Sequence, residues 1–368
     1  MRQTVPAVAA LSLLALLAAA CGSSGGGSSG SSSSSPSAAT AAAFKACVIS
    51  DTGTINDKSF NQSAYAGATQ AAAASGGKIT AQYLPSSSPS DYASNITSFI
   101  NQKCGIIVTV GFLMGDATAT AAKANPSQKF AIVDFGYAKP FKNVSALSYN
   151  TVEDGFQGGY LAAGMSKTHK VATFGGQKLP TVTIYMDGFW DGVQYYNQKH
   201  HTNVQVLGWN EKTQNGSFTG NFTDITAGQR LTNTFISEGA DIIFPVAGNV
   251  GLGAAKAVQN ADAAAGTQKV NMMWVDVDGC VLAAQYCKYF ITSINKGVTV
   301  SVKNAVVTAA NGTFKGGTYV GTLANGGVGL APYHDFASKV PASLQSELTQ
   351  IKADIISGKI KPATPSPA

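Results

Sequence analysis

The chain lacks both clustered positive charge and the short motifs of nucleotide and hydrolase chemistry. Its 25 Lys and Arg residues against 19 Asp and Glu give a net charge of +6, and the basic residues are spread along the chain. A nucleic-acid-binding surface is therefore not expected. No GxxxxGK[ST] phosphate loop occurs, and neither GxGxxG nor GxSxG stands between an expected strand and helix. These absences argue against a nucleotide-driven enzyme or a serine hydrolase.

Residues that ligate metals are also sparse. The four histidines include one adjacent pair, His200 and His201, whose side chains point to different sides of any helix or strand. No Cys-x-x-Cys or Cys/His spacing indicates zinc. The aspartates of residues 51–57 (DTGTIND) are too sparse for the metal cluster of a nucleoside hydrolase. We expect no metal, no cofactor and no enzymatic activity.

The N-terminus has the composition of a secretion signal followed by a tether. Arg2 supplies a positive start, and residues 5–20 are mostly Ala and Leu, a run shorter than a typical membrane-spanning helix. Cys21 follows directly and resembles the acylated cysteine of a bacterial lipobox, with Ala18 where leucine is usual. Residues 22–43 are Gly, Ser, Ala and Thr with one proline, a composition that forms no core. We expect a signal peptide over 1–20, lipidation of Cys21 and a tether over 21–43. The alternative is an ordinary signal peptide with an incidental cysteine.

Four other cysteines remain, an even number in a compartment that permits disulfides. Cys280 and Cys287 are close enough in sequence to close one loop. Cys47 and Cys104 each lie beside an expected strand, and they either pair or stay as small buried hydrophobic residues.

From Phe44 onward, short apolar runs alternate with helical stretches. A first series has expected strands at 44–50, 79–84, 105–110, 129–135 and 144–149, and helices at 60–74, 91–101 and 116–124. A helix over 151–167 crosses into a second series, with strands at 170–174, 204–208, 240–245 and 271–276 and helices at 183–198, 224–238 and 251–263. The alternation predicts an α/β fold of two Rossmann-like lobes, each with a parallel sheet flanked by helices and joined by interlobe crossovers.

The C-terminal part is harder to place. We expect a strand at 289–294, a helix at 296–309, a Gly-rich hairpin-like run at 317–332 that crosses back between lobes, an outer helix at 341–357, and fraying over 358–368. We assign residues 44–150 plus about 277–295 to lobe 1, and 151–276 plus about 296–325 to lobe 2. Residues 326–368 form a return segment and the C-terminal helix.

Residues 48–63 (VISDTGTINDKSFNQS) carry the clearest sign of a ligand site. An apolar strand stops at Asp51, and Asn56-Asp57 can cap a helix whose first turn carries Phe60 and Asn61. Open α/β sheets bind ligands where a strand's carboxyl end meets a helix N-terminus. No nucleophile is paired with a base in this stretch, so we interpret it as part of a binding site for a small molecule.

Several ordered segments resemble the basic membrane lipoprotein family, nucleoside-binding proteins of ABC-type importers with the type I periplasmic-binding-protein fold. They are SDTGTINDKSFNQSAYAG, VGFLMGDA, FAIVDF, DGFQGGYLAAGMS, GADIIFPVAGNVGLG, VDVDG, ITSINKGV and GVGLAP, and they span about 45–335. Two features depart from the family pattern. Residues 210–222 are an inserted run, and Gly279 stands where the family usually has glutamine after the second aspartate of VDVD.

The resemblance implies that a nucleobase is held between two aromatic rings, one from each lobe. The first ring is that of Phe60. The second corresponds to Trp209, with Trp190 as the competing candidate because the insertion blurs the alignment. Rings stack on the flat face of a base without needing specific hydrogen bonds. Met114 either lines the base pocket or fills the core.

Polar groups are assigned on the same resemblance and on their chemistry. Asp51 should recognise the base edge, with Asp57 and Asn61 nearby, although Asp57 is equally well explained as a helix cap. Asp134 and Asp276, both at the carboxyl ends of expected strands, should bind the sugar hydroxyls. Two further candidates, Lys296 and the backbone around Gly248, complete this set. Lys296 begins an expected helix, where a cation is unfavourable, which suggests that it is kept for a partner. Gly248 either lets the backbone approach the ligand or serves a turn.

The function that follows is that of an extracytoplasmic, lipid-anchored receptor on the outer face of the cytoplasmic membrane. It is expected to be a monomer that closes around a nucleoside, with a purine base, and delivers it to an ABC permease. Hinges are expected near 149–153, 277–279 and after 324. Two alternatives stay open: a sugar or other polar ligand in the same fold, and a ligand sensor coupled to a membrane kinase.

Overall fold

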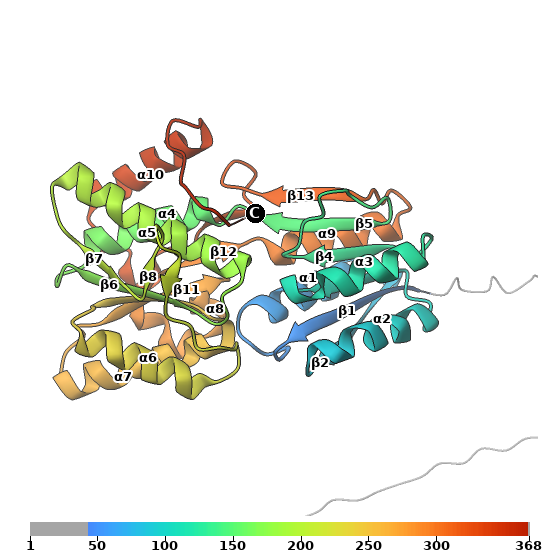
Figure 1. Cartoon of the computed structure of the whole chain (residues 1–368), viewed down its shortest axis with the longest axis horizontal. Coiled ribbons are helices and arrows are strands. Elements are labelled where there is room, and N and C mark those ends of the chain that lie inside the picture. Colours follow the sequence, from blue (N-terminus) through green and yellow to red (C-terminus); the bar gives the residue numbers. More distant parts are fainter. Residues whose placement is uncertain (1–42, 367–368) are drawn as a thin grey trace, which may run out of the picture. The chain divides into compact units, whose positions relative to one another are not determined.

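The first lobe is built on a six-stranded parallel sheet in the order β13-β5-β4-β3-β1-β2 (Figure 1). The computed structural model describes residues 43–366. The strands are β1 (Phe44–Thr52), β2 (Ile79–Ser86), β3 (Ile106–Val110), β4 (Phe130–Val133), β5 (Val144–Tyr149) and β13 (Gly317–Gly321). Helices α1 (Phe60–Ala73) and α9 (Val298–Ala310) pack together on one face, and α2 (Tyr92–Asn101) and α3 (Gly115–Ala124) on the other.

The second lobe repeats this plan with the order β14-β12-β11-β10-β6-β7. Its strands are β6 (Lys170–Gly175), β7 (Gln205–Leu207), β10 (Ile242–Val246), β11 (Asn271–Asp276), β12 (Phe290–Lys296) and β14 (Val328–Leu330), of which only β14 is antiparallel. One face carries α4 (Val152–Met165), α5 (Pro180–His200) and α10 (Ala342–Ile356); the other carries α6 (Ile225–Ser237) and α7 (Gly251–Ala265). The predicted two-lobed α/β architecture is confirmed.

Shorter elements fill the connections. They are the ribbon of β8 (Trp209–Asn210) and β9 (Asn215–Gly216), the helix α8 (Gly279–Leu282), and the 3-10 turns η1 (Pro89–Asp91), η2 (Phe112–Met114), η3 (Gly248–Val250), η4 (Ala284–Tyr289) and η5 (His334–Phe336). The ribbon lies in the inserted run and pairs Trp209 with Gly216.

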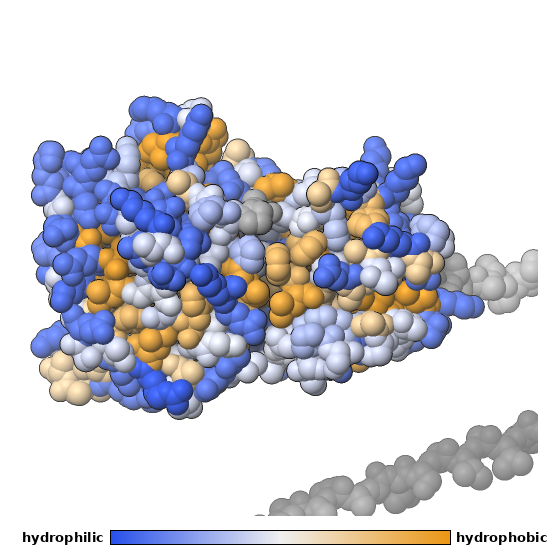
Figure 2. Space-filling model, in the orientation of Figure 1, coloured by the Kyte–Doolittle hydropathy of each residue, from blue (hydrophilic) through white to orange (hydrophobic). Residues whose placement is uncertain are grey.

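Burial along β1 explains why its sequence is apolar on both sides. Ala46 and Val48 face the core shared with α1 and α9, whereas Cys47 and Ile49 face α2. Alternate residues of a strand point to opposite faces, so a sheet covered by helices on both sides needs apolar residues throughout. In the view of Figure 2, hydrophilic residues cover much of the outer surface, as expected when helices bury their apolar side against a sheet.

Glycines allow α4 and α5 to pack backbone against backbone. A Cβ atom on Gly155 or Gly159 of α4 would overlap the main chain of α5, and one on Gly188 or Gly192 would overlap the main chain of α4. The glycines of DGFQGGYLAAGMS therefore have a packing role. They bring the N-terminal end of α5 close to the point where α4 enters the second lobe.

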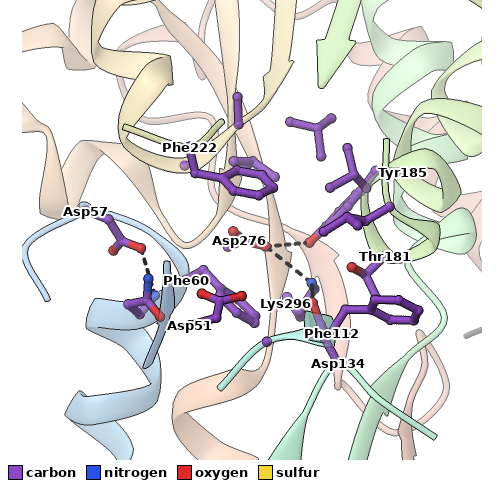
Figure 3. Close-up of a pocket in the computed structure, with 18 of the residues that line it drawn as sticks. Asp51, Asp57, Phe60, Phe112, Asp134, Thr181, Tyr185, Phe222, Asp276 and Lys296 are labelled. Carbon is purple, nitrogen blue, oxygen red and sulfur yellow. Dashed lines mark hydrogen bonds and ion pairs between the residues drawn. The ribbon is translucent and has the colours of Figure 1, made fainter. Parts of the chain in front are cut away.

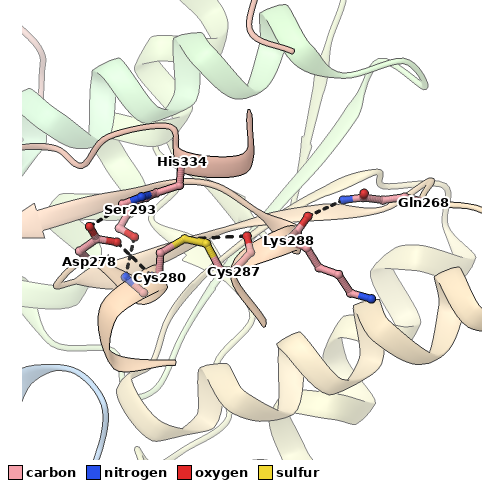
Figure 4. Close-up of a disulfide and its surroundings, with 8 residues drawn as sticks. Gln268, Asp278, Cys280, Cys287, Lys288, Ser293 and His334 are labelled. Atoms are coloured by element: carbon pink, nitrogen blue, oxygen red, sulfur yellow. Dashed lines mark hydrogen bonds and ion pairs between the residues drawn. A yellow bond between two sulfur atoms is a disulfide. The ribbon is translucent and has the colours of Figure 1, made fainter. Parts of the chain in front are cut away.

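The expected Cys280–Cys287 disulfide is present, and Cys47 and Cys104, whose pairing was left open, are also joined. Cys47 of β1 is joined to Cys104, just before β3, and so links two neighbouring strands of the first sheet. Cys280 is joined to Cys287 across the turn from α8 to η4 (Figure 4). The same turn is held by Asp278, whose carboxylate accepts from the Cys280 N–H at 3.0 Å and contacts His334 Nε2 at 2.7 Å.

Three short segments join the lobes: residues 150–151 between β5 and α4, Gly297 between β12 and α9, and 322–327 between β13 and β14. The Glu153 carboxylate accepts from Asn150 Nδ2 and from the Leu323 N–H, each at 2.7 Å. Gly297 N–H donates to the Gly327 carbonyl at 2.8 Å. The three crossovers therefore lie side by side. The hinge predicted at 277–279 is wrong, because that segment connects two elements of the second lobe.

Strand pairing overturns the predicted lobe assignment of the C-terminal part. β12 pairs with β11, so residues 290–296 belong to the second lobe, not the first. α9 packs on α1 and β13 pairs with β5, so 298–321 belong to the first lobe. The run 317–332 is not a hairpin, because β13 and β14 lie in different sheets. Lys296 ends β12 and does not begin a helix, which starts at Val298.

The C-terminal segment is held against α5, so the predicted fraying is wrong for residues 363–366. The Ala363 N–H donates to Asp191 at 2.7 Å, and the Thr364 hydroxyl donates to the Asp187 carboxylate at 2.6 Å.

The predicted signal peptide, the lipidation site Cys21 and nearly all of the tether fall in residues 1–42, outside the described part of the chain. Within residues 43–366, no helix is both long enough and apolar enough to cross a membrane.

Candidate ligand-binding site

A cavity lies between the lobes, at the carboxyl ends of the parallel strands of both sheets. The space between its walls, counted together with its opening to solvent, is about 570 Å³. The first lobe contributes residues that follow β1, β3 and β4, and the second contributes the start of α5 and the ends of β10, β11 and β12. The lining residues are Asp51, Thr52, Asp57, Phe60, Asn61, Gly111, Phe112, Asp134, Leu179, Thr181, Val182, Tyr185, Phe222, Val246, Ala247, Gly248, Val275, Asp276 and Lys296.

Lys296 is the centre of a buried charge network that spans the two lobes (Figure 3). Its Nζ lies 2.8 Å from Asp134 Oδ2 in the first lobe and 3.6 Å from Asp276 Oδ1 in the second. Burial alone would lower the pKa of Lys296, but the charges of Asp134 and Asp276 outweigh burial and raise that pKa. Burial raises the pKa of Asp134, and the nearby ammonium opposes this rise. Lys296 is therefore held as a cation between carboxylates.

Asp134 and Asp276 have the same unusual backbone conformation. Each comes at the end of a strand, with φ of 65° and 67° respectively, in the left-handed region that few residues other than glycine adopt. Strain of this kind is found chiefly at functional sites, where it directs a side chain. Here it directs one carboxylate from each lobe toward Lys296.

Asp276 is also tied to both walls of the cavity. Its Oδ2 accepts from the Ser59 hydroxyl at 2.7 Å, and its Oδ1 accepts from the Tyr185 hydroxyl at 3.1 Å. Because Ser59 belongs to the first lobe, this hydrogen bond is a second link across the cleft. The Trp274 indole N–H adds a third by donating to the Lys58 carbonyl at 3.1 Å.

Asp57 caps α1 from inside the cavity. Its carboxylate accepts from the N–H groups of Ser59, Asn61 and Gln62 at 3.0, 2.8 and 3.1 Å. Burial raises the pKa of Asp57 to about 6, although these donors act in the opposite direction. The neighbouring Asn61 is buried, and its Oδ1 has no hydrogen-bond partner within the described chain. Asp57 is thus a helix cap as well as a cavity residue.

Asp51 presents a carboxylate at the end of β1. It is buried, and its pKa is raised well above the ordinary value by burial and by the charges of Asp134 and Asp57. The carboxylate packs directly on Gly111, where a Cβ atom would overlap it, and Gly111 has a positive φ of 114°. Glycine is required here because it allows the side chain of Asp51 and the chain after β3 to approach closely.

Aromatic rings enter the cavity from both lobes. Phe60 begins α1 in the first lobe, and Phe222 ends the inserted run of the second lobe; Figure 3 shows their side chains on opposite sides of the cavity. Both rings are only partly buried. Lys296 Nζ lies 5.1 Å from the Phe60 ring centroid and 5.2 Å from that of Tyr185, close enough for a cation–π interaction.

A family model described as an ABC transporter substrate-binding protein, PnrA-like, matches residues 44–368. The chain belongs to the Bmp family. A relative from Lactococcus lactis subsp. cremoris, the ABC transporter nucleoside-binding protein BmpA, is 30% identical over 328 residues, which cover 86% of this chain and 88% of the relative. A protein of Pyrococcus horikoshii named as an uncharacterised lipoprotein is 28% identical over 291 residues, covering 78% and 68% of the two chains. Among solved structures, an ABC transporter solute-binding protein from Aeropyrum pernix has a TM-score of 0.77 and 25% identity, covering 88% of this chain and 94% of that one.

This Bmp-family chain is therefore a substrate-binding protein of the ABC-transporter type, and the interlobe cavity is its candidate substrate site. All but two of the site residues expected from the sequence line it. Those that do are Asp51, Asp57, Phe60, Asn61, Asp134, Gly248, Asp276 and Lys296.

Met114 and Trp209 do not line the cavity. Met114 is fully buried in the core beneath α2 and α3, so the core interpretation holds. Trp209 is 3% exposed, and its indole N–H donates to Asp187 at 3.0 Å. Its competitor Trp190 also lies outside the lining, with Lys212 Nζ 5.6 Å from its ring. Neither tryptophan therefore lines the cavity of this Bmp-family protein.

Phe222 lines the cavity from the second lobe and was not among the residues expected from the sequence. Phe222 lies in the inserted run, two residues before Asp224, which caps α6 by accepting from the Ala227 N–H at 2.9 Å. Phe222 precedes its helix cap, whereas Phe60 follows Asp57, so the pattern that identified Phe60 does not identify Phe222. Tyr185, Phe112 and Thr181 were also missed.

Proposed function

We propose that this Bmp-family protein binds a purine nucleoside in the interlobe cavity and delivers it to an ABC permease. The observation that carries the proposal is the presence of Phe60 and Phe222, one ring from each lobe, in a cavity that also holds Lys296 between two carboxylates. The first feature suits a flat heterocycle and the second suits a polyol.

The base is expected to lie between the two rings. Stacking on an aromatic ring contributes about 1–3 kcal/mol per base and needs no particular pattern of hydrogen bonds. Phe60 and Phe222 are not packed away in the core, since each is partly exposed to the cavity.

The base edge is expected to meet Asp51 and Asn61. The Asp51 carboxylate is buried at the cavity wall, and the buried Asn61 Oδ1 has no hydrogen-bond partner within the described chain. Buried polar groups are normally satisfied, so these two acceptors favour a ligand that carries N–H donors. Purine bases offer amino and ring N–H groups of this kind.

The sugar hydroxyls are expected to donate to Asp134 and Asp276. The two carboxylates flank one ammonium, so adjacent hydroxyls can donate to the acids and accept from Lys296. The Gly248 backbone, at a positive φ of 53° with open space beside it, allows close approach from the second lobe.

Delivery requires that a permease distinguish the liganded protein. We propose that the lobes close by a hinge at the three crossovers, where Glu153 ties two segments together, and that the ligand replaces water between the lobes. We further propose that Cys21 is lipidated and holds a monomeric receptor on the outer face of the cytoplasmic membrane, as the lipobox-like sequence and the flexible tether suggest.

A thermal-shift panel on residues 43–368 tests the ligand class. A nucleoside at a hundred times its dissociation constant should stabilise the protein by about 2.7 kcal/mol. Adenosine or guanosine should raise the melting temperature, and free ribose should not. A shift with free sugars alone would support a sugar receptor. Genes for a permease and an ATPase beside this one would separate an importer from a kinase-coupled sensor.

Variants test the site. Phe60→Ala should abolish the nucleoside-induced shift while leaving the unliganded melting point nearly unchanged. Asp276→Asn should also abolish the shift, since asparagine tolerates the left-handed backbone. This variant should lower the unliganded melting point as well, because it removes one of the two charges that pair with the buried Lys296. A large drop in the unliganded melting point of Phe60→Ala would identify Phe60 as structural.

A further inference from the structure

The cleft does not end at Asp134. Beyond this carboxylate lies a second chamber of about 740 Å³, counting its opening to solvent. Phe112, Asp134 and Thr181 line both cavities, so the chamber adjoins the substrate cavity at these three residues. Its other walls come from the residues after β4 and from β5 and β13.

A buried hydroxyl without a partner lies on the wall of this chamber. Ser148 is 2% exposed, and its Oγ has no hydrogen-bond partner within residues 43–366. Among buried hydroxyls, Thr109 pairs with Thr118 and Thr173 donates to the Phe244 carbonyl, each at 2.8 Å. The hydroxyls of Tyr92, Thr151 and Thr232 also lack a partner within the described residues, but of these unpartnered hydroxyls only that of Ser148 belongs to a residue of the chamber wall. An orphaned hydroxyl is uncommon in a protein interior and favours a missing hydrogen-bonding partner in the chamber.

The composition of the walls sets the chemistry of that partner. Phe112, Phe135 and Tyr137 form a row of rings with centroids 5.2 and 4.9 Å apart. Thr181 and Thr318 add hydroxyls, and Asp134 at the junction adds a carboxylate. A phosphate would face this carboxylate and is disfavoured, whereas an uncharged chain with an apolar body and a hydroxyl end matches the rings and Ser148.

We propose that this chamber, which we call the Ser148 chamber, binds an uncharged substituent at the 5′ position of the nucleoside. The inference rests on the proposed function, because it takes the 2′ and 3′ hydroxyls to be engaged at Lys296, Asp134 and Asp276. The 5′ position is then the one left on the sugar to carry a group past Asp134. The site would thus accept neutral 5′-extended nucleosides as well as unmodified ones.

Gly136 offers a way to fill the chamber without disturbing the base site. Gly136 is exposed, and a Cβ atom built on it would meet only the Ser148 Oγ, at an ordinary contact distance of 3.5 Å. Gly136→Leu should therefore fold normally and place its side chain in the chamber. Ala93→Leu, on the exposed face of α2, is a matched control that adds an apolar side chain far from both cavities.

The experiment is calorimetric titration of the mature chain with three ligands. These are adenosine, 5′-deoxy-5′-(3-hydroxypropylthio)adenosine, and the 5′-butylthio analogue, in which a methyl replaces the terminal hydroxyl. We expect both extended ligands to bind the wild type within about threefold of adenosine, and Gly136→Leu to weaken them about tenfold or more while leaving adenosine within about twofold. Ala93→Leu should change none of the three.

Ser148→Ala tests the hydroxyl separately. The wild type should prefer the hydroxylated ligand over the butylthio ligand, and Ser148→Ala should remove that preference without changing the affinity for adenosine. If adenosine binds but the extended ligands bind more than about tenfold more weakly than adenosine, the chamber is not a subsite. The inference then fails while the proposed function stands. An equal effect of Gly136→Leu on all three ligands also overturns it. If no nucleoside binds, the proposed function and this inference fall together.

Discussion

Truncation of Phe222 is the sharpest test of how the two lobes share the ligand. Phe222→Ala removes the second-lobe ring while the carboxylates and Lys296 stay in place. Stacking contributes about 1–3 kcal/mol per base, so nucleoside affinity should fall about 5- to 150-fold. The ring is partly buried and packs on Gly176, so the loss of stability should be well below the about 3–5 kcal/mol of a fully buried phenylalanine.

Phe218→Ala is the matched control. Phe218 lies in the same inserted run and is also partly buried, but it packs edge-on against Trp209, with ring centroids 5.9 Å apart, and does not line the cavity. Calorimetric titration of both variants with adenosine should show weaker binding for Phe222→Ala alone. Equal losses in the two variants would mean that the inserted run acts only through its fold. An unchanged affinity in Phe222→Ala would refute a base held between two rings.

Three further predictions follow from the charges and the disulfides. Lys296→Met leaves Asp134 and Asp276 buried without their cation, so urea denaturation at pH 7 should show a loss of about 3–5 kcal/mol; an unchanged midpoint would mean that the ion pairs carry no stability. The pKa of Asp57 is raised from 3.8 to about 6, so the folded state binds more protons than the unfolded state between these values, and this carboxyl makes the unliganded protein less stable as pH rises from about 4 to 6. Nucleoside N–H groups bind an ionised carboxylate better than a protonated one. The rise in melting temperature caused by the nucleoside should therefore be smaller at pH 5 than at pH 7, and a larger rise at pH 5 would contradict this prediction. Replacing Cys47 and Cys104 by alanine should cost about 4 kcal/mol, against about 2–3 kcal/mol for Cys280 and Cys287, because the first disulfide closes a longer loop; chemical denaturation of the two double variants measures the difference.

Much of the fold was predictable because the sheets are covered on both faces. Strands such as β3 and β10 are continuous apolar runs between polar helices, and this pattern is visible without any tertiary information. The same logic located Asp51, Asp134 and Asp276. Each follows a buried run, and the carboxyl ends of parallel strands meet at one edge of a sheet.

The local sequence pattern does not specify which sheet a strand near the C-terminal end of the chain joins. The segment 289–310 was correctly expected to contain a strand and then a helix, but its assignment between the lobes was reversed, because pairing of β12 with β11 is a long-range choice. The position of Lys296 followed from the same boundary. Lys296 is the last residue of β12, and its ammonium donates to Asp134. The sequence analysis had also proposed Lys296 as a ligand-binding residue, but for another reason, namely that a cation is unfavourable at the helix start predicted there.

Phe222 was missed as a cavity residue for a different reason. Trp209 is large, aromatic and at the end of a strand, which made it the natural candidate. Its burial depends on Asp187 of α5, which accepts its indole N–H, and on the fold of the inserted run, neither of which is visible in the local sequence. The predicted fraying of the C-terminal segment was wrong for a similar reason. Ala363 and Thr364 form hydrogen bonds with aspartates of α5, and these long-range contacts are not visible in the local sequence.

The most direct test of the central claim is a crystal structure of residues 43–368 grown with adenosine. The account predicts the adenine ring between Phe60 and Phe222, and the ribose hydroxyls within hydrogen-bond distance of Asp134, Asp276 and Lys296. Adenosine bound elsewhere, or with its base away from both rings, would contradict it.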